Sequence, residues 1–131
     1  MAMDECGAET GERITEAELA VMEALWARAP LGATEVAAAV GAVRGWSLAT
    51  VKTLLSRLVS KQAVSTVPDG RRFLYSPAIA RTDYLGGESK RLVDRLFGGR
   101  AAPLFAQLAE AEALTDADLA EIEALLKALR K

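Results

Sequence analysis

The sequence contains no histidine and a single cysteine, and these absences exclude several classes of function. Without histidine the chain cannot build a Ser-His-Asp or Cys-His catalytic arrangement. Nearly all protein zinc sites also require Cys or His, so we expect no metal and no cofactor. The pairs Gly86-Gly87 and Gly98-Gly99 lack the spacing and the preceding strand of a phosphate-binding loop. The chain is therefore predicted not to be an enzyme.

Long hydrophobic runs are also missing. No apolar stretch approaches the roughly 18 residues that a membrane span requires, so no membrane insertion is expected. The first residues, MAMDECGAETGER, are acidic and lack the apolar segment of a signal peptide. We predict that residues 1–12 form a disordered tail. The only cysteine, Cys6, lies there and cannot form an internal disulfide, which fits a reducing, cytoplasmic location.

Positive charge is concentrated in one part of this acidic chain. From Arg44 to Arg81 there are seven basic residues and one acidic residue, a net charge of +6. Residues 1–43 contain two basic and eight acidic residues, a net charge of −6, and residues 82–131 contain seven and nine, a net charge of −2. A basic segment in an otherwise acidic chain is expected to bind a polyanion.

The segment from residue 47 to residue 61 predicts an amphipathic helix. Ser47 is a good N-cap. A helical wheel places apolar residues on one arc: Leu48, Val51, Leu54, Leu55, Leu58 and Val59. The opposite arc is uncharged-polar or basic and contains no acid, and burial of the apolar arc turns it toward solvent.

A β-hairpin is predicted to follow this helix, with strands over residues 63–67 and 72–76. Pro68-Asp69-Gly70 between them has the composition of a turn. Two helices are expected upstream. One runs from a capping box at Thr15 and Glu18 to about residue 28, and a shorter one extends from a cap at Thr34 to Gly41.

Three helices followed by a two-stranded hairpin is the order of a winged helix-turn-helix domain, predicted here over residues 13–79. The hydroxyl and methyl groups of the third helix can meet bases, and its cations and those of the hairpin can neutralise phosphates. The predicted DNA-binding residues are Ser47, Ala49, Thr50, Lys52, Thr53, Ser56, Arg57, Lys61, Arg71 and Arg72. Two alternatives stay open: a merely solvated polar face, and a protein-interaction module that does not bind DNA.

The remaining residues, 80–131, predict three further helices. Gly98-Gly99 ends the first, Pro103 fits the first turn of the second, and Thr115 with Asp118 caps the third. Their apolar stripes exceed what three short helices can bury internally, so a second copy is the expected partner. The predicted dimerisation residues are Leu85, Leu92, Leu96, Phe97, Phe105, Leu108, Leu119, Ile122 and Leu126. The alternative is a helical cap on the winged domain of the same chain.

Three segments, ITEAELAVMEALW, WSLATVKTLLSRLVSKQAV and RRFLYSP, resemble the BlaI/MecI/CopY family of penicillinase and methicillin-resistance repressors. The resemblance covers about residues 14–131. It implies a mainly α-helical fold with a small β-hairpin, in which a winged helix-turn-helix domain precedes a helical dimerisation domain. It also implies a homodimeric transcriptional repressor of a palindromic operator. The matching positions for DNA contacts are Thr50, Lys52, Thr53 and Arg57 of the third helix and Arg71 and Arg72 of the hairpin.

The chain departs from the family pattern in three places. Ala49 stands where relatives often carry a basic or polar residue, which leaves the operator sequence open. The cysteine cluster of the copper-responsive branch is missing. In the β-lactam branch a membrane sensor metalloprotease cuts an Asn-Phe bond, whereas residues 104–107 here read Leu-Phe-Ala-Gln. Release by such a protease is implied by the resemblance, but its cut site is not.

Overall fold

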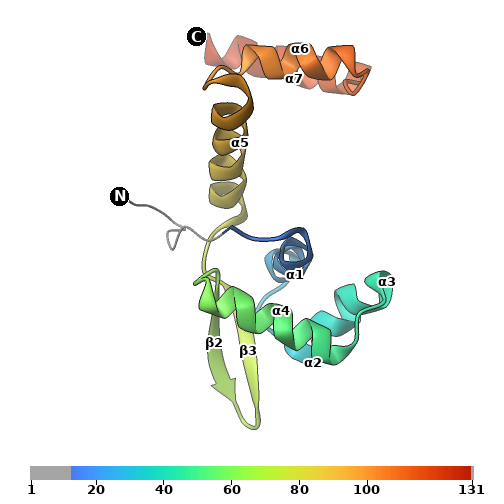
Figure 1. Ribbon diagram of the computed structural model, residues 1–131, viewed down its shortest axis with the longest axis vertical. Coiled ribbons are helices and arrows are strands. Elements are labelled where there is room, and N and C mark those ends of the chain that lie inside the picture. The colour runs from blue at the N-terminus through green and yellow to red at the C-terminus, as the bar shows by residue number, and fades with distance from the viewer. Residues whose placement is uncertain (1–12, 131) are drawn as a thin grey trace. The chain divides into compact units, whose positions relative to one another are not determined.

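The computed structural model describes residues 13–130, so the predicted disordered tail and Cys6 lie outside the described residues. The chain divides into two compact units, Met1–Tyr84 and Leu85–Lys131 (Figure 1). The division falls inside helix α5 (Arg81–Phe97), whereas the sequence suggested a boundary just before it. The first turn of α5 belongs to the N-terminal unit because the Tyr84 ring lies 5.7 Å from the ring of Trp26.

The N-terminal unit combines short helices with a three-stranded antiparallel sheet in the order β1-β3-β2. Its elements are α1 (Glu16–Ala27), β1 (Leu31–Gly32), α2 (Ala33–Val36), the π-helical turn η1 (Ala37–Gly41), α3 (Ala42–Arg44), α4 (Leu48–Ser60), β2 (Val64–Asp69) and β3 (Arg72–Pro77). The expectation of a mainly helical winged fold with a small sheet is confirmed. The predicted capping box at the start of α1 is also present, with bonds between Thr15 and Glu18 in both directions.

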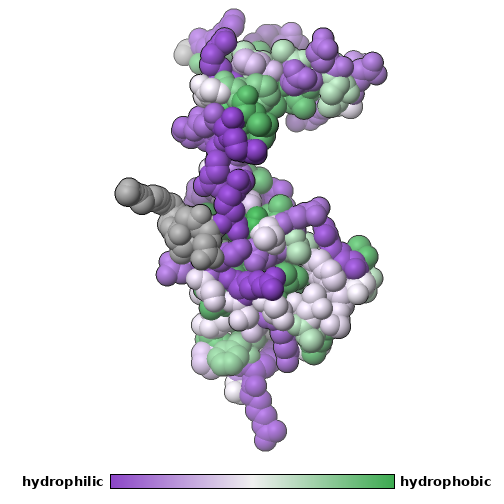
Figure 2. Space-filling view, in the orientation of Figure 1, coloured by the Kyte–Doolittle hydropathy of each residue, from purple (hydrophilic) through white to green (hydrophobic). Residues whose placement is uncertain are grey.

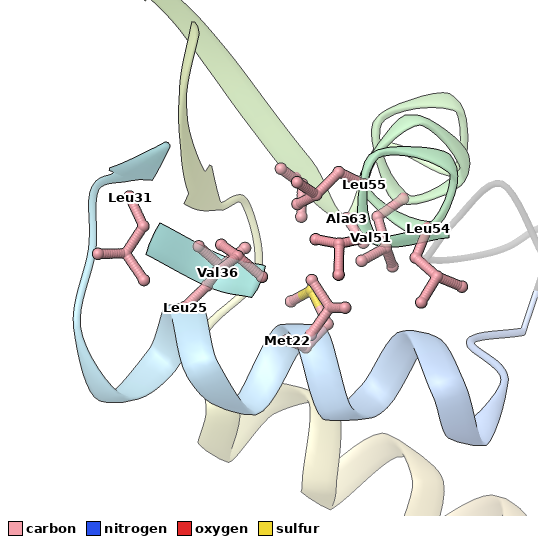
Figure 3. Packing of buried hydrophobic residues seen from close by; sticks show 11 residues of the cluster. Met22, Leu25, Leu31, Val36, Val51, Leu54, Leu55 and Ala63 are labelled. Carbon is pink, nitrogen blue, oxygen red and sulfur yellow. The ribbon is translucent and has the colours of Figure 1, made fainter. Parts of the chain in front are cut away.

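One hydrophobic core holds this unit together, and α4 supplies a large part of it (Figure 3). The α4 residues in the core are Val51, Leu54, Leu55 and Leu58, and they pack against α1, α2 and the start of β2. The ends of the expected apolar arc, Leu48 and Val59, are partly exposed instead, because the packed surface is narrower than the arc. Burial of the central residues fixes which face of α4 meets solvent.

The helix before α4 differs from the prediction at both ends. It starts at Ala33, where Glu35 accepts a hydrogen bond from the backbone of Gly32 at 2.7 Å, so Thr34 is not its cap. It also continues past Gly41 to Arg44 and ends at Gly45, whose φ is +73°. Gly41 instead permits a close approach, since a Cβ there would lie 3.0 Å from the carbonyl oxygen of Trp46.

The hairpin is longer and tighter than expected. Asp69 pairs with Arg72, so the loop is Gly70-Arg71 and not Pro68-Asp69-Gly70. Gly70 takes a φ of +65°, the left-handed backbone that two-residue hairpin loops need. The sequence also failed to predict β1, which pairs Leu31 with Tyr75. Two residues are too few to show strand periodicity, and the pairing is visible only in the folded chain.

The C-terminal unit contains most of α5, then α6 (Ala102–Glu110) and α7 (Asp116–Leu129). The predicted capping box at the start of α7 is present, with reciprocal hydrogen bonds of 3.0 Å between Thr115 and Asp118. None of the described residues of these helices is buried. Figure 2 shows hydrophobic surface over this unit. Within residues 13–130, no helix is long and apolar enough to span a membrane.

Candidate nucleic-acid interface

Helix α4 presents the predicted polar face to solvent. Ser47 caps it, because its Oγ accepts a hydrogen bond from the backbone N–H of Thr50 at 3.2 Å. The core contacts of Val51 and Leu55 lie on the opposite side, so the polar arc is exposed. The structure leaves these predicted residues of α4 and its cap exposed: Ser47, Ala49, Thr50, Lys52, Thr53, Ser56 and Arg57.

The two threonines on this face are already constrained within the helix. The hydroxyl of Thr50 lies 3.1 Å from the Ser47 hydroxyl, and Thr53 donates its proton to the carbonyl of Ala49 at 3.1 Å. A hydroxyl that has donated its proton still has acceptor lone pairs. Thr53 therefore presents an acceptor and a methyl group, a combination suited to the amino groups and thymine methyls of base edges and not to phosphate oxygens.

The cations near this face fall into two groups. Lys52, Arg57 and Arg71 are exposed, and within residues 13–130 they make no ion pair and no hydrogen bond from their side chains. Arg72 has two carboxylate neighbours, since its Nη1 lies 3.4 Å from Glu35 and its Nε lies 3.3 Å from Asp69. A phosphate beside Arg72 would meet these two negative charges, so Arg72 is less suited to a DNA contact than Arg71.

Lys61, which was predicted to contact DNA, has partners within the chain. Its side chain is only 15% exposed, and its Nζ lies 2.6 Å from the carboxylate of Glu18, which is 1% exposed. It also donates to the backbone carbonyl of Arg13 at 2.7 Å. The ammonium group therefore connects the end of α4 to the start of α1, so Lys61 is less available to a phosphate than Lys52 or Arg57.

The periodicity of α1 could have indicated that Glu18 is buried, although it does not identify the partner of this acid. Glu18, Val21, Met22 and Leu25 have the spacing of one helix face, and all four are buried. An acid on a buried face needs a partner of opposite charge or several hydrogen bonds. Burial raises the pKa of Glu18, but its hydrogen bonds to Lys61 and Thr15 and the charge of Lys61 outweigh burial and leave that pKa below its usual value.

A shallow groove separates the C-terminal half of α4 from the wing, the hairpin of β2 and β3. Its volume is about 220 Å³. The residues that line it are Ser56, Val59, Thr66, Phe73 and Tyr75. Of these, only Ser56 was among the predicted DNA contacts. The others were not predicted because the groove depends on how the wing packs against α4.

Comparison with known proteins identifies the family. The model of the penicillinase repressor family matches residues 14–128. The chain belongs to the penicillinase repressor family. It is similar to the penicillinase repressor of Bacillus licheniformis, with 29% identity over 88% of this chain and 90% of that protein. It is also similar to the methicillin resistance regulatory protein MecI of Staphylococcus aureus strain N315, with 25% identity over 86% of this chain and 92% of MecI.

Solved structures of winged-helix proteins are also similar to this chain. The solution structure of the DNA-binding domain of the repressor BlaI has a TM-score of 0.51 and 36% sequence identity, and covers 55% of this chain and 88% of that chain. A likeness in fold alone extends to wild-type MarR from E. coli, with a TM-score of 0.50 and 24% identity over 88% of this chain and 77% of that chain. The family model and the similar solved structures therefore both indicate a winged-helix fold.

Proposed function

We propose that the chain is a homodimeric transcriptional repressor that binds a palindromic operator. Helix α4 enters the major groove and the wing contacts the adjacent backbone. The observation that carries the proposal is the exposed face of α4, which contains Lys52 and Arg57, lacks acids and has no ion pair within the described chain. The names of the relatives, penicillinase repressor and MecI, and the DNA-binding function of the BlaI domain support it.

The test measures binding to duplex DNA from upstream of the protein's own gene over a range of salt concentrations. Each phosphate neutralised by Lys or Arg should contribute about −0.9 to the slope of log K against log salt concentration. Arg57→Ala should weaken binding and make the slope less negative by about 0.9 for each half-site, because one cation per protomer is lost. Fluorescence anisotropy gives both quantities.

Arg72→Ala is the matched control, because Arg72 is a similarly exposed arginine that already has two carboxylate partners. It should change the salt slope less than Arg57→Ala. A wild-type protein that forms no salt-sensitive complex would contradict the proposal and favour a protein-interaction module instead. An Arg57→Ala protein with unchanged affinity and slope would show that α4 is not the helix that meets DNA.

The C-terminal unit supports the homodimer part of the proposal. The predicted dimerisation residues all lie in α5, α6 or α7, and none is buried within the chain. Leu96, Phe105, Leu119 and Leu126 are among the exposed large hydrophobic residues. An apolar surface of this kind is typical of a protein interface. A second copy is the simplest partner because a dimer places two α4 helices on the two halves of a palindrome.

Leu126→Asp should weaken the dimer at least tenfold, because a carboxylate placed in an apolar interface loses its hydration. Lys127→Asp is the control: it also introduces a carboxylate, at a neighbouring and exposed position of α7. Sedimentation equilibrium measures the dissociation constant of each protein. Equal effects of the two substitutions would indicate a charge effect, and a dimer unaffected by Leu126→Asp would place the interface elsewhere.

Loss of the dimer would release the operator, because two linked half-site contacts bind far more tightly than one. Cleavage by a membrane sensor metalloprotease, as the family resemblance implies, is one such route. Phe105 lies in α6 but is preceded by Leu104, so no Asn-Phe bond is present there. A protease of this kind would have to cut a different bond of the C-terminal unit.

A further inference from the structure

The groove between α4 and the wing contains three hydroxyl groups with no partner in the described chain. Ser56 comes from α4, Thr66 from β2 and Tyr75 from β3, and Thr66 is the cross-strand partner of Tyr75. Within residues 13–130, none of the three side chains makes a hydrogen bond. Their hydroxyl protons therefore remain available to an acceptor from outside the chain.

The rest of the groove is apolar and carries no acid. Val59 and Phe73 complete its lining, and Phe73 is 53% exposed. Figure 2 shows hydrophobic surface on the wing, next to its hydrophilic tip. Hydroxyl donors around an apolar floor match a ligand that alternates acceptor oxygens with nonpolar groups. A sugar-phosphate strand has this character, because phosphate oxygens alternate with the carbon face of deoxyribose.

Two cations lie on the same helix and hairpin that line the groove, close in sequence to lining residues. Along α4, Lys52 lies one turn before Ser56 on the same face. On the wing, Arg71 occupies the loop that leads into β3 and thus toward Phe73. Both cations lack an ion pair within residues 13–130, and Asp69, the acid of the wing, is paired with Arg72. The surroundings therefore favour an anionic occupant over a neutral small molecule.

We infer that this groove is a binding subsite for one phosphodiester of the operator backbone. Ser56, Thr66 and Tyr75 donate hydrogen bonds to phosphate oxygens, and Phe73 packs on the neighbouring deoxyribose. Such contacts carry no base information but fix how deeply α4 sits in the major groove. The inference rests on the proposed function, since it assumes that α4 and the wing bind DNA.

A triple variant, Ser56→Ala with Thr66→Val and Tyr75→Phe, tests the subsite by removing only the three hydroxyl groups. Affinity for the duplex from upstream of the gene should fall at least tenfold, because a hydrogen bond to an ionised phosphate oxygen contributes a factor of about ten or more. The salt slope should stay unchanged, because no cation is lost. Phe73→Ala alone should also weaken binding about fivefold through loss of apolar contact.

The control is Ser65→Ala with Ser76→Ala, a cross-strand pair at the positions next to Thr66 and Tyr75, whose side chains point to the opposite face of the hairpin. This control should retain wild-type affinity. Thermal unfolding checks that each variant folds. Ethylation of backbone phosphates should then interfere with wild-type binding at one phosphate per half-site where the triple variant shows no interference.

The possible results test the phosphate subsite and the proposed repressor function independently. A wild-type protein that binds DNA, together with a folded triple variant of equal affinity, would overturn the subsite and leave the repressor proposal intact. A triple variant that loses affinity only through a smaller salt slope would indicate that the hydroxyl groups position a cation instead, which also overturns it. Absence of DNA binding by the wild-type protein would contradict the proposed function itself.

Discussion

Replacing Lys61 by Met is expected to lower the free energy of unfolding of the N-terminal unit by about 3 kcal/mol, near the lower end of the range for broken buried ion pairs. The loss leaves the carboxylate of Glu18, which is 1% exposed, without its ammonium partner 2.6 Å away. The value is at the lower end because Lys61 retains 15% exposure, so that water can partly replace it. Urea unfolding at neutral pH, followed by circular dichroism, measures the change.

The ion pair between Lys61 and Glu18 also predicts a loss of stability at acid pH. The pKa of Glu18 lies below its usual value of 4.5 in the folded chain, because hydrogen bonds and the charge of Lys61 outweigh the effect of burial. The stability that this carboxylate contributes is therefore complete above about pH 4.5 and is lost as the pH falls through the lower, folded pKa. In the Lys61→Met protein this dependence should be weaker or reversed, since only the hydrogen bonds to Thr15 would then oppose the burial that raises the pKa of Glu18.

Two further variants distinguish the effect of losing the buried ion pair from the effect of losing an exposed one. Arg81→Met removes an ion pair of the same unit, with Glu23 at 3.0 Å, in which both side chains are exposed, and should cost less than about 1 kcal/mol. Adding Glu18→Gln to Lys61→Met should recover part of the loss, because no uncompensated charge remains buried. Equal costs for Lys61→Met and Arg81→Met would show that water solvates Glu18 in the folded chain.

Leu55→Ala should be the other strongly destabilising substitution, at a cost of about 2–5 kcal/mol. Leu55 is fully buried in the middle of α4, and its removal leaves a cavity among side chains from α1, α2 and α4. The expected result is a lower urea midpoint with an unchanged m-value. Operator binding should then be lost at temperatures where the variant unfolds and the wild-type protein remains folded.

Leu48→Ala is the matched control for Leu55→Ala. It removes the same atoms from the same helix, but Leu48 is 40% exposed at the start of α4. Its cost should be well below that of Leu55→Ala, because less apolar surface leaves water when it folds and no closed cavity results. If both substitutions shift the urea midpoint equally, the packing of α4 against α1 is looser than the burial of Leu55 indicates.

Local patterns predicted much of the fold because they are decided within a few residues. The capping boxes at Thr15 and Thr115 and the stop at Gly98-Gly99 depend on neighbouring backbone groups, and each is present. The prediction that the second helix ends at Gly41 is wrong, because the role of this glycine depends on a residue outside the helix. A glycine near a helix end usually terminates it, but here its missing side chain accommodates the carbonyl of Trp46, a contact set by the turn into α4.

In the candidate DNA-binding site, too, local features could be predicted from the sequence and contacts between distant residues could not. The exposed face of α4 follows from the apolar arc that the core buries, so the exposure of Thr50, Lys52 and Arg57 could be predicted without coordinates. Their contact with DNA remains a prediction. The partners of Lys61 and Arg72 could not be predicted from local periodicity, because Glu18 and Glu35 are 43 and 37 residues away along the chain.

By itself, the sequence determined the helical and hairpin segments, the segregation of positive charge between residues 44 and 81, and the face of α4 that is free to meet a polyanion. These properties follow from residue order and from 3.6-residue periodicity. Only the tertiary structure decided which cations remain unpaired, that β1 joins the sheet, and that Ser56, Thr66 and Tyr75 share one groove. Ion pairs and grooves join residues distant in sequence, and their geometry exists only once the core has fixed α4 against the wing.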